Sequence, residues 1–275
     1  MKRWWKSFRR MFVMRAEISK TADYGFFMLA VVTILVAYHL TAYSDTNKLF
    51  PRWDQLWEGV KKIITDPVTG DHFLWEDTLA SFGRILPAIG LSAVIGVTLG
   101  MYMGLYAPVK SFTERILTFF GGIPANAVMV IFMAYLGFEL KMFVGVIAFG
   151  IMMMITKAVY FAVKAIHNEE IYSLKMLGCS NTEIIWSILF YQILPQILAA
   201  VQATFSPAFI FVISAEWISA NVGFGYRFMM FKRTARMELI IPYVFYLGLL
   251  NVLILGIFSI LERVLCPWYV KEDNS

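Results

Sequence analysis

The sequence predicts an all-α fold, a polytopic transmembrane helical bundle of about six spans. Hydrophobic residues make up 59% of the chain and charged residues 16%, whereas soluble domains carry roughly a quarter charged residues. The long apolar stretches lack the two-residue alternation of transmembrane strands. Lipid offers no partner to an unpaired backbone N–H or C=O, so these stretches must be helices.

The first part of the chain, residues 1–78, contains three predicted elements. Residues 1–20 mix tryptophan and phenylalanine with basic residues, which predicts an amphipathic helix lying in the headgroup region. Residues 21–78 hold the first span, the uncharged stretch Tyr24–Tyr43, and an acidic outward loop after it. Within that loop we expect a short surface helix at Trp53–Ile64 and a turn at residues 66–71.

The core of the bundle is expected over residues 79–268, followed by a cytoplasmic tail at residues 269–275. The remaining spans are predicted at Leu79–Leu105, Ile116–Phe138, Met142–Val163, Gln196–Glu216 and Ile240–Glu262. Residues 184–194 are too short to cross the membrane, which predicts an interfacial helix broken at Pro195. Residues 217–239 are expected to form a loop.

Two glycine-containing patterns predict how these spans pack and bend. Gly96, Gly100 and Gly104 leave bare backbone on one helix face, where a neighbouring helix can approach closely. Gly121, Gly122 and Pro124 are expected to kink the third span.

The basic residues predict the orientation of the chain. Seven of the first twenty residues are Lys or Arg, which favours a cytoplasmic N-terminus because the first helix usually dominates topology. Both termini are then cytoplasmic. The loop at 217–239 falls outside, although it contains Arg227, Lys232, Arg233 and Arg236 against Glu238.

Several chemistries are excluded by the motifs that the sequence lacks. It contains no phosphate-binding Gly-rich loop ending in Lys-Ser/Thr, no His-Glu-x-x-His helix and no Gly-x-Ser-x-Gly elbow. We therefore expect no metal, no bound cofactor and no catalysis by this chain. The basic excess near a span favours anionic lipid over nucleic acid. The sixteen methionines are interpreted as packing residues, and Cys179 and Cys266 as inert thiols.

A polar segment between the fourth and fifth spans predicts a contact with another protein. Residues 168–182 form a short cytoplasmic helix whose acidic start suits a helix N-terminus and whose apolar side chains could enter a partner groove. Gly178 is expected to stop this helix. An incidental surface helix is the alternative to a docking element. The candidate contact residues are Glu169, Glu170, Tyr172, Leu174, Lys175, Leu177, Gly178 and Cys179.

Glu216 is a charge at the end of an apolar span and needs a partner or water. One interpretation places it in a translocation path, where Ser214, Ser219 and Asn221 could also touch a solute. The other makes it an interface residue that binds Arg227 or a backbone amide. Gly223 and Gly225 are expected to allow a sharp turn.

The motifs of the chain resemble those of binding-protein-dependent ABC importer permeases with the type I fold. The resemblance covers about residues 75–268. Leu177-Gly178-Cys179-Ser180 followed by Gln192-Ile193-Leu194-Pro195 resembles the family's cytoplasmic coupling motif. Tyr172-Ser173-Leu174 stands where the family has Glu-Ala-Ala, and Tyr191 where it has a first proline. Further matching stretches are Ser81 with Arg84, Gly122-Ile123-Pro124, Leu136-Gly137-Phe138, residues 215–226, Leu261-Glu262-Arg263 and Pro267-Trp268.

The resemblance implies a permease of the bacterial inner membrane that works with other subunits. These are a second permease copy, expected as a homodimer, two cytoplasmic ATPase subunits that bind the ATP, and an extracytoplasmic solute-binding protein. The branch resembles nitrate, sulfonate, taurine and bicarbonate permeases, which implies an anion; a flat heterocycle is equally compatible with the aromatic content. A membrane-embedded transferase and a membrane scaffold are the alternative functions.

Overall fold

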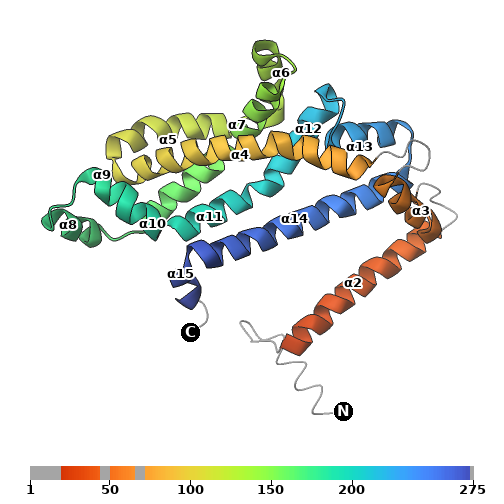
Figure 1. Ribbon diagram of the computed structural model, residues 1–275, viewed down its shortest axis with the longest axis horizontal. Helices are drawn as coiled ribbons and strands as arrows, with labels where there is room; N and C mark the ends of the chain where they lie inside the picture. The colour runs from red at the N-terminus through yellow and green to blue at the C-terminus, as the bar shows by residue number, and fades with distance from the viewer. Residues whose placement is uncertain (1–19, 44–49, 66–71, 273–275) are drawn as a thin grey trace. The chain divides into compact units, whose positions relative to one another are not determined.

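The computed structural model describes residues 20–43, 50–65 and 72–272, and every regular element within these ranges is a helix. The predicted all-α fold is confirmed. The predicted turn at 66–71 and nearly all of the predicted amphipathic helix at 1–20 lie outside the described residues. The chain forms two compact units, residues 1–58 and 59–275, and Figure 1 labels the helices of both.

The first unit is built on α2 (Lys20–Ala42), which agrees with the predicted first span. Near its end, Tyr38 donates a hydrogen bond to the carbonyl of Pro51 at 2.7 Å, and Trp53 Nε1 lies 3.2 Å from His39 Nδ1. These contacts give His39 a polar partner at the end of the span. The surface helix α3 (Trp53–Ile64) has the predicted bounds and crosses the boundary between the units.

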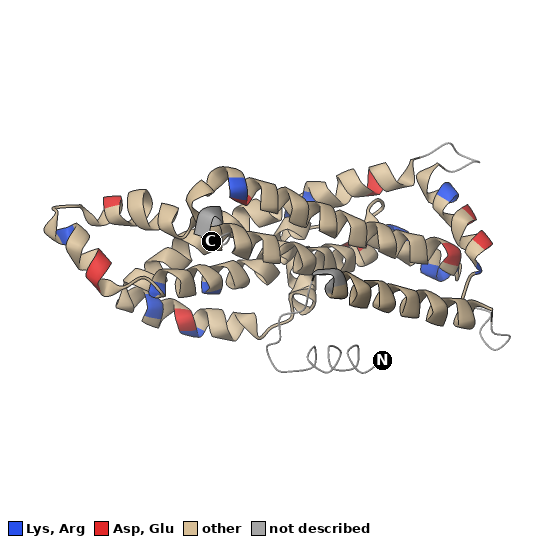
Figure 2. Ribbon diagram, turned by 90° about the horizontal axis from the view of Figure 1, so that it is seen from below, with Lys and Arg blue, Asp and Glu red and all other residues tan. Residues whose placement is uncertain are grey.

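The described helices include five that are long and apolar enough to cross a membrane, or six if the bent pair α5 and α6 forms one span. This agrees with the prediction of about six. In Figure 2, long stretches of helix carry no charged residue, and most charges gather toward helix ends and on the short helices.

The centre of the second unit is the packing of α4 (Phe73–Leu105) against α7 (Leu140–Lys164). A Cβ atom added to Gly100 would lie 2.7 Å from the carbonyl oxygen of Thr156, and one added to Gly104 would lie 2.6 Å from Val163 Cγ1. The predicted close approach at these glycines is therefore confirmed, since no larger residue fits without a shift.

The third predicted span is two helices rather than one kinked helix. α5 (Ala107–Gly121) and α6 (Ala125–Leu136) meet at 97°. The backbone N–H groups of Gly122 and Ile123 close the end of α5 with short-range bonds to Phe119 and Phe120. Pro124 then begins α6 because it cannot donate to the preceding turn. α5 starts at Ala107, earlier than predicted, because Pro108 suits a first helical turn.

The segment predicted to be an interfacial helix packs one face into the bundle and leaves Trp186 and Tyr191 exposed on the other. It consists of α9 (Asn181–Glu183), the π-helix η1 (Ile184–Leu189) and α10 (Phe190–Gln192). Leu189 and Ile193 are 0% and 2% exposed and pack in one cluster with residues of α4 and α7. The helix breaks at Ile193, and α11 (Leu194–Ala203) carries Pro195 in its first turn.

The remaining elements differ from several predicted boundaries. α12 (Phe205–Ser219) continues from α11, the predicted loop at 217–239 contains α13 (Phe224–Arg233), and α14 (Met237–Leu265) is longer than predicted. α15 (Pro267–Glu272) occupies part of the predicted tail. α4 begins at Phe73, not Leu79, so Asp77 belongs to a helix and not to the acidic loop.

Candidate functional site

α8 (Asn168–Met176) is the predicted contact helix, and Figure 1 shows it at one end of the second unit. Tyr172, Met176 and Leu177 are 63%, 89% and 79% exposed. Leu174 and Cys179 face the other way and pack against the buried cluster of α4, α7 and η1. The three apolar residues predicted to form one face are thus divided: Leu174 anchors the helix, and Tyr172 and Leu177 point outward.

The end of α8 is a complete Schellman motif. Gly178 has a positive φ of 85°, its N–H bonds the carbonyl of Lys175, and the N–H of Cys179 bonds the carbonyl of Leu174. This 5→2 and 6→1 pattern, with a contact between the two outer residues, is the standard left-handed helix ending. The predicted helix stop at Gly178 is confirmed.

A capping box begins the next helix and holds the chain after α8. The Ser180 N–H donates to Glu183 Oε2 at 2.8 Å, and the Glu183 N–H donates to Ser180 Oγ at 3.3 Å. The donated backbone bond lowers the pKa of the Glu183 carboxyl. Gln192 Nε2 also donates to Glu170 Oε2 at 3.0 Å, which ties α8 to α10.

A cavity of about 230 Å³ lies between α8 and the end of α4. It is lined by the end of α4, by α8 and by the start of η1, including Tyr106, Tyr172 and Lys175. Glu169, like Lys175, is exposed on α8. α8 is therefore an exposed helix that packs on one side, is held at its end and has a cavity beside it.

A second cluster of polar groups is buried where α4 meets the turn between α12 and α13. Glu216 is 0% exposed and accepts bonds from Arg84 at 2.5 Å, from Ser81 at 2.7 Å and from the N–H of Gly225 at 2.8 Å. Ser81 Oγ in turn accepts the N–H of Phe224 at 3.0 Å.

Asp77 is the centre of the other half of this cluster and is also 0% exposed. It accepts two bonds from Arg227, at 2.8 and 3.2 Å, and one from the Tyr243 hydroxyl at 2.5 Å. The N–H of Gly223 donates to it at 3.0 Å. Each buried carboxylate therefore has one arginine and one backbone amide, as buried charges require.

The contacts of Glu216 agree in part with the second interpretation. Glu216 accepts a bond from a backbone amide, as that interpretation predicts, but its cation is Arg84 rather than Arg227. Asp77 and Tyr243 were not predicted from the sequence. The spacing of Asp77, Ser81 and Arg84 places them on one face of α4, and this polar stripe in an apolar helix was the available signal.

The turn that closes the cluster depends on two glycines. Gly223 has φ of 125°, and a Cβ on it would lie 2.6 Å from the Glu216 carboxylate. A Cβ on Gly225 would collide with the carbonyl oxygen of Ile213. The predicted role in a sharp turn is confirmed for Gly223, whereas Gly225 lies in the first turn of α13 and allows close packing against α12.

The other proposed path residues do not gather around Glu216. Ser214 donates to Ile210 and accepts a 3.3 Å bond from Asn126 of α6. Ser219 donates to Ala215 within its own helix. Asn221 is exposed in the turn. Ser214 is thus the member of this set that reaches α6.

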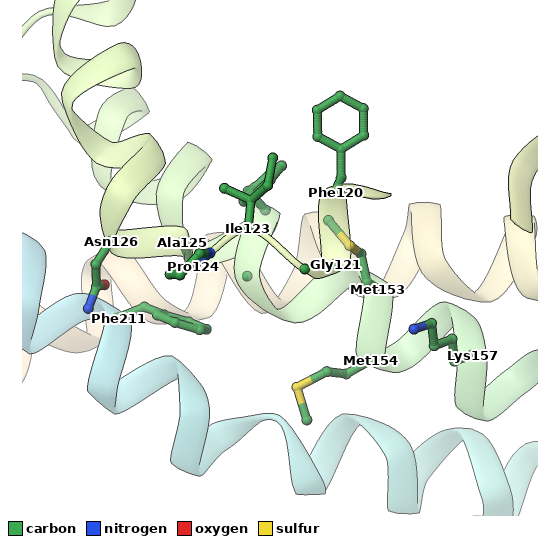
Figure 3. Close-up of a pocket in the computed structure, with 13 residues that line it drawn as sticks. Phe120, Gly121, Ile123, Pro124, Ala125, Asn126, Met153, Met154, Lys157 and Phe211 are labelled. Carbon is green, nitrogen blue, oxygen red and sulfur yellow. The ribbon is translucent and has the colours of Figure 1, made fainter. Parts of the chain in front are cut away.

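A cavity of about 380 Å³ opens at the break between α5 and α6. Figure 3 shows α7 side chains Met153, Met154 and Lys157 on one side of it and Phe211 and Asn126 on another. Cys179 and Cys266 are free thiols, and the described residues contain no group of three or more His, Cys, Asp or Glu able to hold a metal.

Comparison with known proteins gives the relatives of the chain. The putative ABC transporter permease MJ0413 of Methanocaldococcus jannaschii is 23% identical over 82% of this chain and 85% of its own length. The taurine transport system permease TauC of Escherichia coli is 22% identical over 72% of both chains. The bicarbonate permease CmpB of Synechocystis is 25% identical over 72% of this chain and 71% of its own.

A solved structure has the same fold. A chain of the inward-facing MetNI methionine ABC transporter superposes with a TM-score of 0.56 at 16% identity, covering 70% of this chain and 97% of that one. The family model described as "Binding-protein-dependent transport system inner membrane component" matches residues 96–267. The chain therefore belongs to this family and is a multi-pass membrane permease of an ABC transporter.

Proposed function

We propose that the chain is the permease subunit of an ATP-driven importer, in which two copies enclose the path of a small solute delivered by an extracytoplasmic solute-binding protein. Cytoplasmic ABC ATPase subunits bind α8 and hydrolyse the ATP, and this chain binds no cofactor. The proposed orientation places both termini in the cytoplasm. The proposed solute is an anion of the nitrate, sulfonate, taurine or bicarbonate type, which the names of two relatives favour.

The geometry of α8 is the observation that supports this proposal. The helix exposes Tyr172, Met176 and Leu177 together, and large apolar side chains grouped on a short polar helix are typical of a surface covered by a partner. Leu174 and Cys179 connect the same helix to the buried cluster between α4 and α7. A force applied to the exposed side is therefore transmitted to the two most closely packed spans.

Coupling of ATP to transport then follows from differential binding. An ATPase dimer that binds one conformation of the permease more tightly than another shifts the population toward the first. The ratio of the two affinities sets the size of the shift. The glutamates Glu169 and Glu170 and the cation of Lys175 add charge-specific contacts around the apolar side chains of α8.

A co-purification experiment tests the proposed ATPase contact. The chain is purified in mild detergent from its native host through a C-terminal tag, and the associated subunits are identified by mass spectrometry. Met176→Asp places a charge at the centre of the exposed face and is expected to remove the ATPase subunit. Met230→Asp is the matched control, because Met230 is an exposed methionine on the short helix α13.

The outcomes separate the proposal from its alternatives. Recovery of an ATPase with the wild-type chain and with Met230→Asp, but not with Met176→Asp, supports it. Purification of the wild-type chain without any ATPase contradicts the importer function. Equal recovery with both variants contradicts the role of α8.

A further inference from the structure

Lys157 is an exposed lysine of α7 that takes part in none of the ion pairs formed by the described residues. The buried carboxylates, by contrast, are paired, Glu216 with Arg84 and Asp77 with Arg227. α7 ends at Lys164, which places Lys157 about 10 Å inside that end of the helix. A lysine facing lipid near the bilayer centre costs roughly 2.5–3.5 kcal/mol, so this ammonium needs water, a dipole or a ligand.

The Lys157 side chain does not reach toward the nearer end of its helix. Figure 3 shows its ammonium directed toward Met153 and the break between α5 and α6. A Cβ on Gly121, the last residue of α5, would lie 3.9 Å from Lys157 Nζ. The negative end of the α5 dipole stabilises a cation at this point. The charge is thus held beside the cavity and directed away from the membrane surface.

The walls of the cavity are mainly apolar and aromatic. The large side chains among the lining residues are three phenylalanines and two methionines, Phe120, Phe149, Phe211, Met153 and Met154, and the polar ones are Asn126 and Lys157. The set contains one cation, one side-chain amide and no carboxylate. Ala125 and Asn126 form the first turn of α6, where the N–H groups lack intrahelical acceptors and the dipole favours negative charge.

This chemistry distinguishes between kinds of anion. A small inorganic oxyanion loses several water hydrogen bonds on entering a site and needs several donors to replace them. The cavity offers one ammonium, one amide and the start of one helix. An anion with an apolar or aromatic body would place its charge near Lys157 and its body against the phenylalanines and methionines.

We propose that the cavity at the α5–α6 break is a solute subsite of the translocation path, and that Lys157 selects organic anions there. The inference rests on the proposed function, because a subsite of this kind serves a permease whose path passes this face of α7. It narrows the proposed solute from anions in general to those with an apolar body.

Charged thiol reagents test the electrostatic part of the proposal. Met154 is 44% exposed at the cavity, and Met154→Cys is treated in membrane vesicles with an anionic sulfonatoethyl or a cationic trimethylammonium-ethyl methanethiosulfonate. Modification is read by mass spectrometry of the peptide, so Cys179 and Cys266 do not interfere. Asn126→Cys, on another wall of the cavity, provides a second reporter.

The expected result is a preference for the anionic reagent. One unit charge about 8 Å away in a water-like medium changes the anion-to-cation rate ratio roughly fivefold, relative to a free thiol. Lys157→Gln should remove the preference, and Lys141→Gln, at the other end of α7, should leave it unchanged. Reporters that neither reagent modifies would show that the cavity holds no water and would overturn the proposal, as would a ratio that Lys157→Gln does not alter.

Protection of the reporter cysteines tests the class of solute. Benzenesulfonate, nitrate and benzyltrimethylammonium are added to the vesicles at equal concentration before the anionic reagent, with ionic strength held constant. Benzenesulfonate should slow modification most and should lose its effect in Lys157→Gln. Equal protection by nitrate or by the cation, or no protection by any of them, contradicts an organic-anion subsite.

The two proposals fail in different ways. Loss of the ATPase in the co-purification experiment contradicts the proposed function and leaves the reagent ratio unaffected. If the reporter cysteines show no charge preference or do not react, and the chain still binds its ATPase, only the subsite proposal is contradicted.

Discussion

Two carboxylates, Asp77 and Glu216, are 0% exposed in a chain of which 59% is hydrophobic. Each has its own arginine, and the shared Ser81 side chain connects Glu216 to the backbone of Phe224. No buried side-chain N or O atom among the described residues lacks a hydrogen-bond partner. Because the bonds of Asp77, Ser81 and Arg84 join α4 to the region 216–243, the cluster fixes the start of α4 against the α12–α13 turn.

Removing one member of the Arg84–Glu216 pair should cost more than removing both. Arg84→Met leaves Glu216 without its cation in a buried position, and breaking such a pair costs about 3–5 kcal/mol. The double variant Arg84→Met, Glu216→Gln removes both charges and should recover a substantial part of that loss. Thermal unfolding of the four proteins in one detergent, compared as a double-mutant cycle, measures the coupling.

The matched control for this cycle is the exposed pair Arg236–Glu238, whose atoms lie 3.3 Å apart. Its removal should change stability by less than about 1 kcal/mol. Additive effects of Arg84→Met and Glu216→Gln would show that the buried pair does not act as a unit.

At the scale of elements, the α4–α7 contact depends on the absence of side chains on one face of α4. Gly100→Ala should destabilise the second unit, because its Cβ would lie 2.7 Å from the Thr156 carbonyl and 2.8 Å from Val159 Cβ. Overpacking of this kind typically costs about 1–3 kcal/mol. Thermal unfolding in detergent and the yield of folded protein measure the effect.

Gly90→Ala on the same helix is the control, because no atom lies within 4 Å of its added Cβ. Alanine is a better helix former than glycine by about 1 kcal/mol, so this variant should be neutral or stabilising. If the two variants lower stability equally, close helix contact is not the reason for Gly100.

The capping box after α8 predicts a pH dependence. The pKa of Glu183 is lowered by the backbone N–H of Ser180, so the ionised carboxylate favours the folded state. Its contribution is present above the ordinary glutamate pKa of about 4.3 and is lost as pH falls through the lowered folded pKa. Hydrogen exchange of the 178–190 peptide should therefore be slower in the wild type than in Glu183→Gln at neutral pH.

Glutamine keeps the geometry of the capping box without titrating. The two proteins should therefore become alike at acidic pH. A difference that persists unchanged in acid would assign the protection to something other than the charge of Glu183.

The sequence was sufficient for the elements that physics specifies locally. Uncharged length predicts α2, glycine spacing predicts the α4–α7 contact, and Gly178 predicts the end of α8. The start of α4 and the whole of α13 were missed because both segments contain charged residues, which are typical of loops between spans. Asp77 and Arg227 neutralise each other across 150 positions, and only tertiary structure reveals such a pair. The 97° angle at Pro124 likewise depends on packing, since the sequence marks only a weak point.

At the scale of the whole molecule, the ion pairs bear on the orientation of the chain. Residues 217–239 contain four cations, which the positive-inside rule places in the cytoplasm. Arg227 is paired with buried Asp77, however, and Arg236 lies 3.3 Å from Glu238. The excess positive charge of the segment is therefore largely that of Lys232 and Arg233. It is smaller than that of the seven basic residues among the first twenty.

Cysteine accessibility tests the proposed orientation with two exposed lysines. Lys175→Cys on α8 should react with a membrane-impermeant maleimide only in inverted vesicles, and Lys232→Cys on α13 only in intact cells, with each site read by peptide mass spectrometry. Reaction of both in intact cells would place α8 outside, where no cytoplasmic ATPase could bind it, and would contradict the importer function. Reaction of both only in inverted vesicles would move the α13 segment inside. Two sites on the same side of the membrane must be separated by an even number of crossings. The one span that lies between them, Leu194–Ser219, could then not cross the membrane.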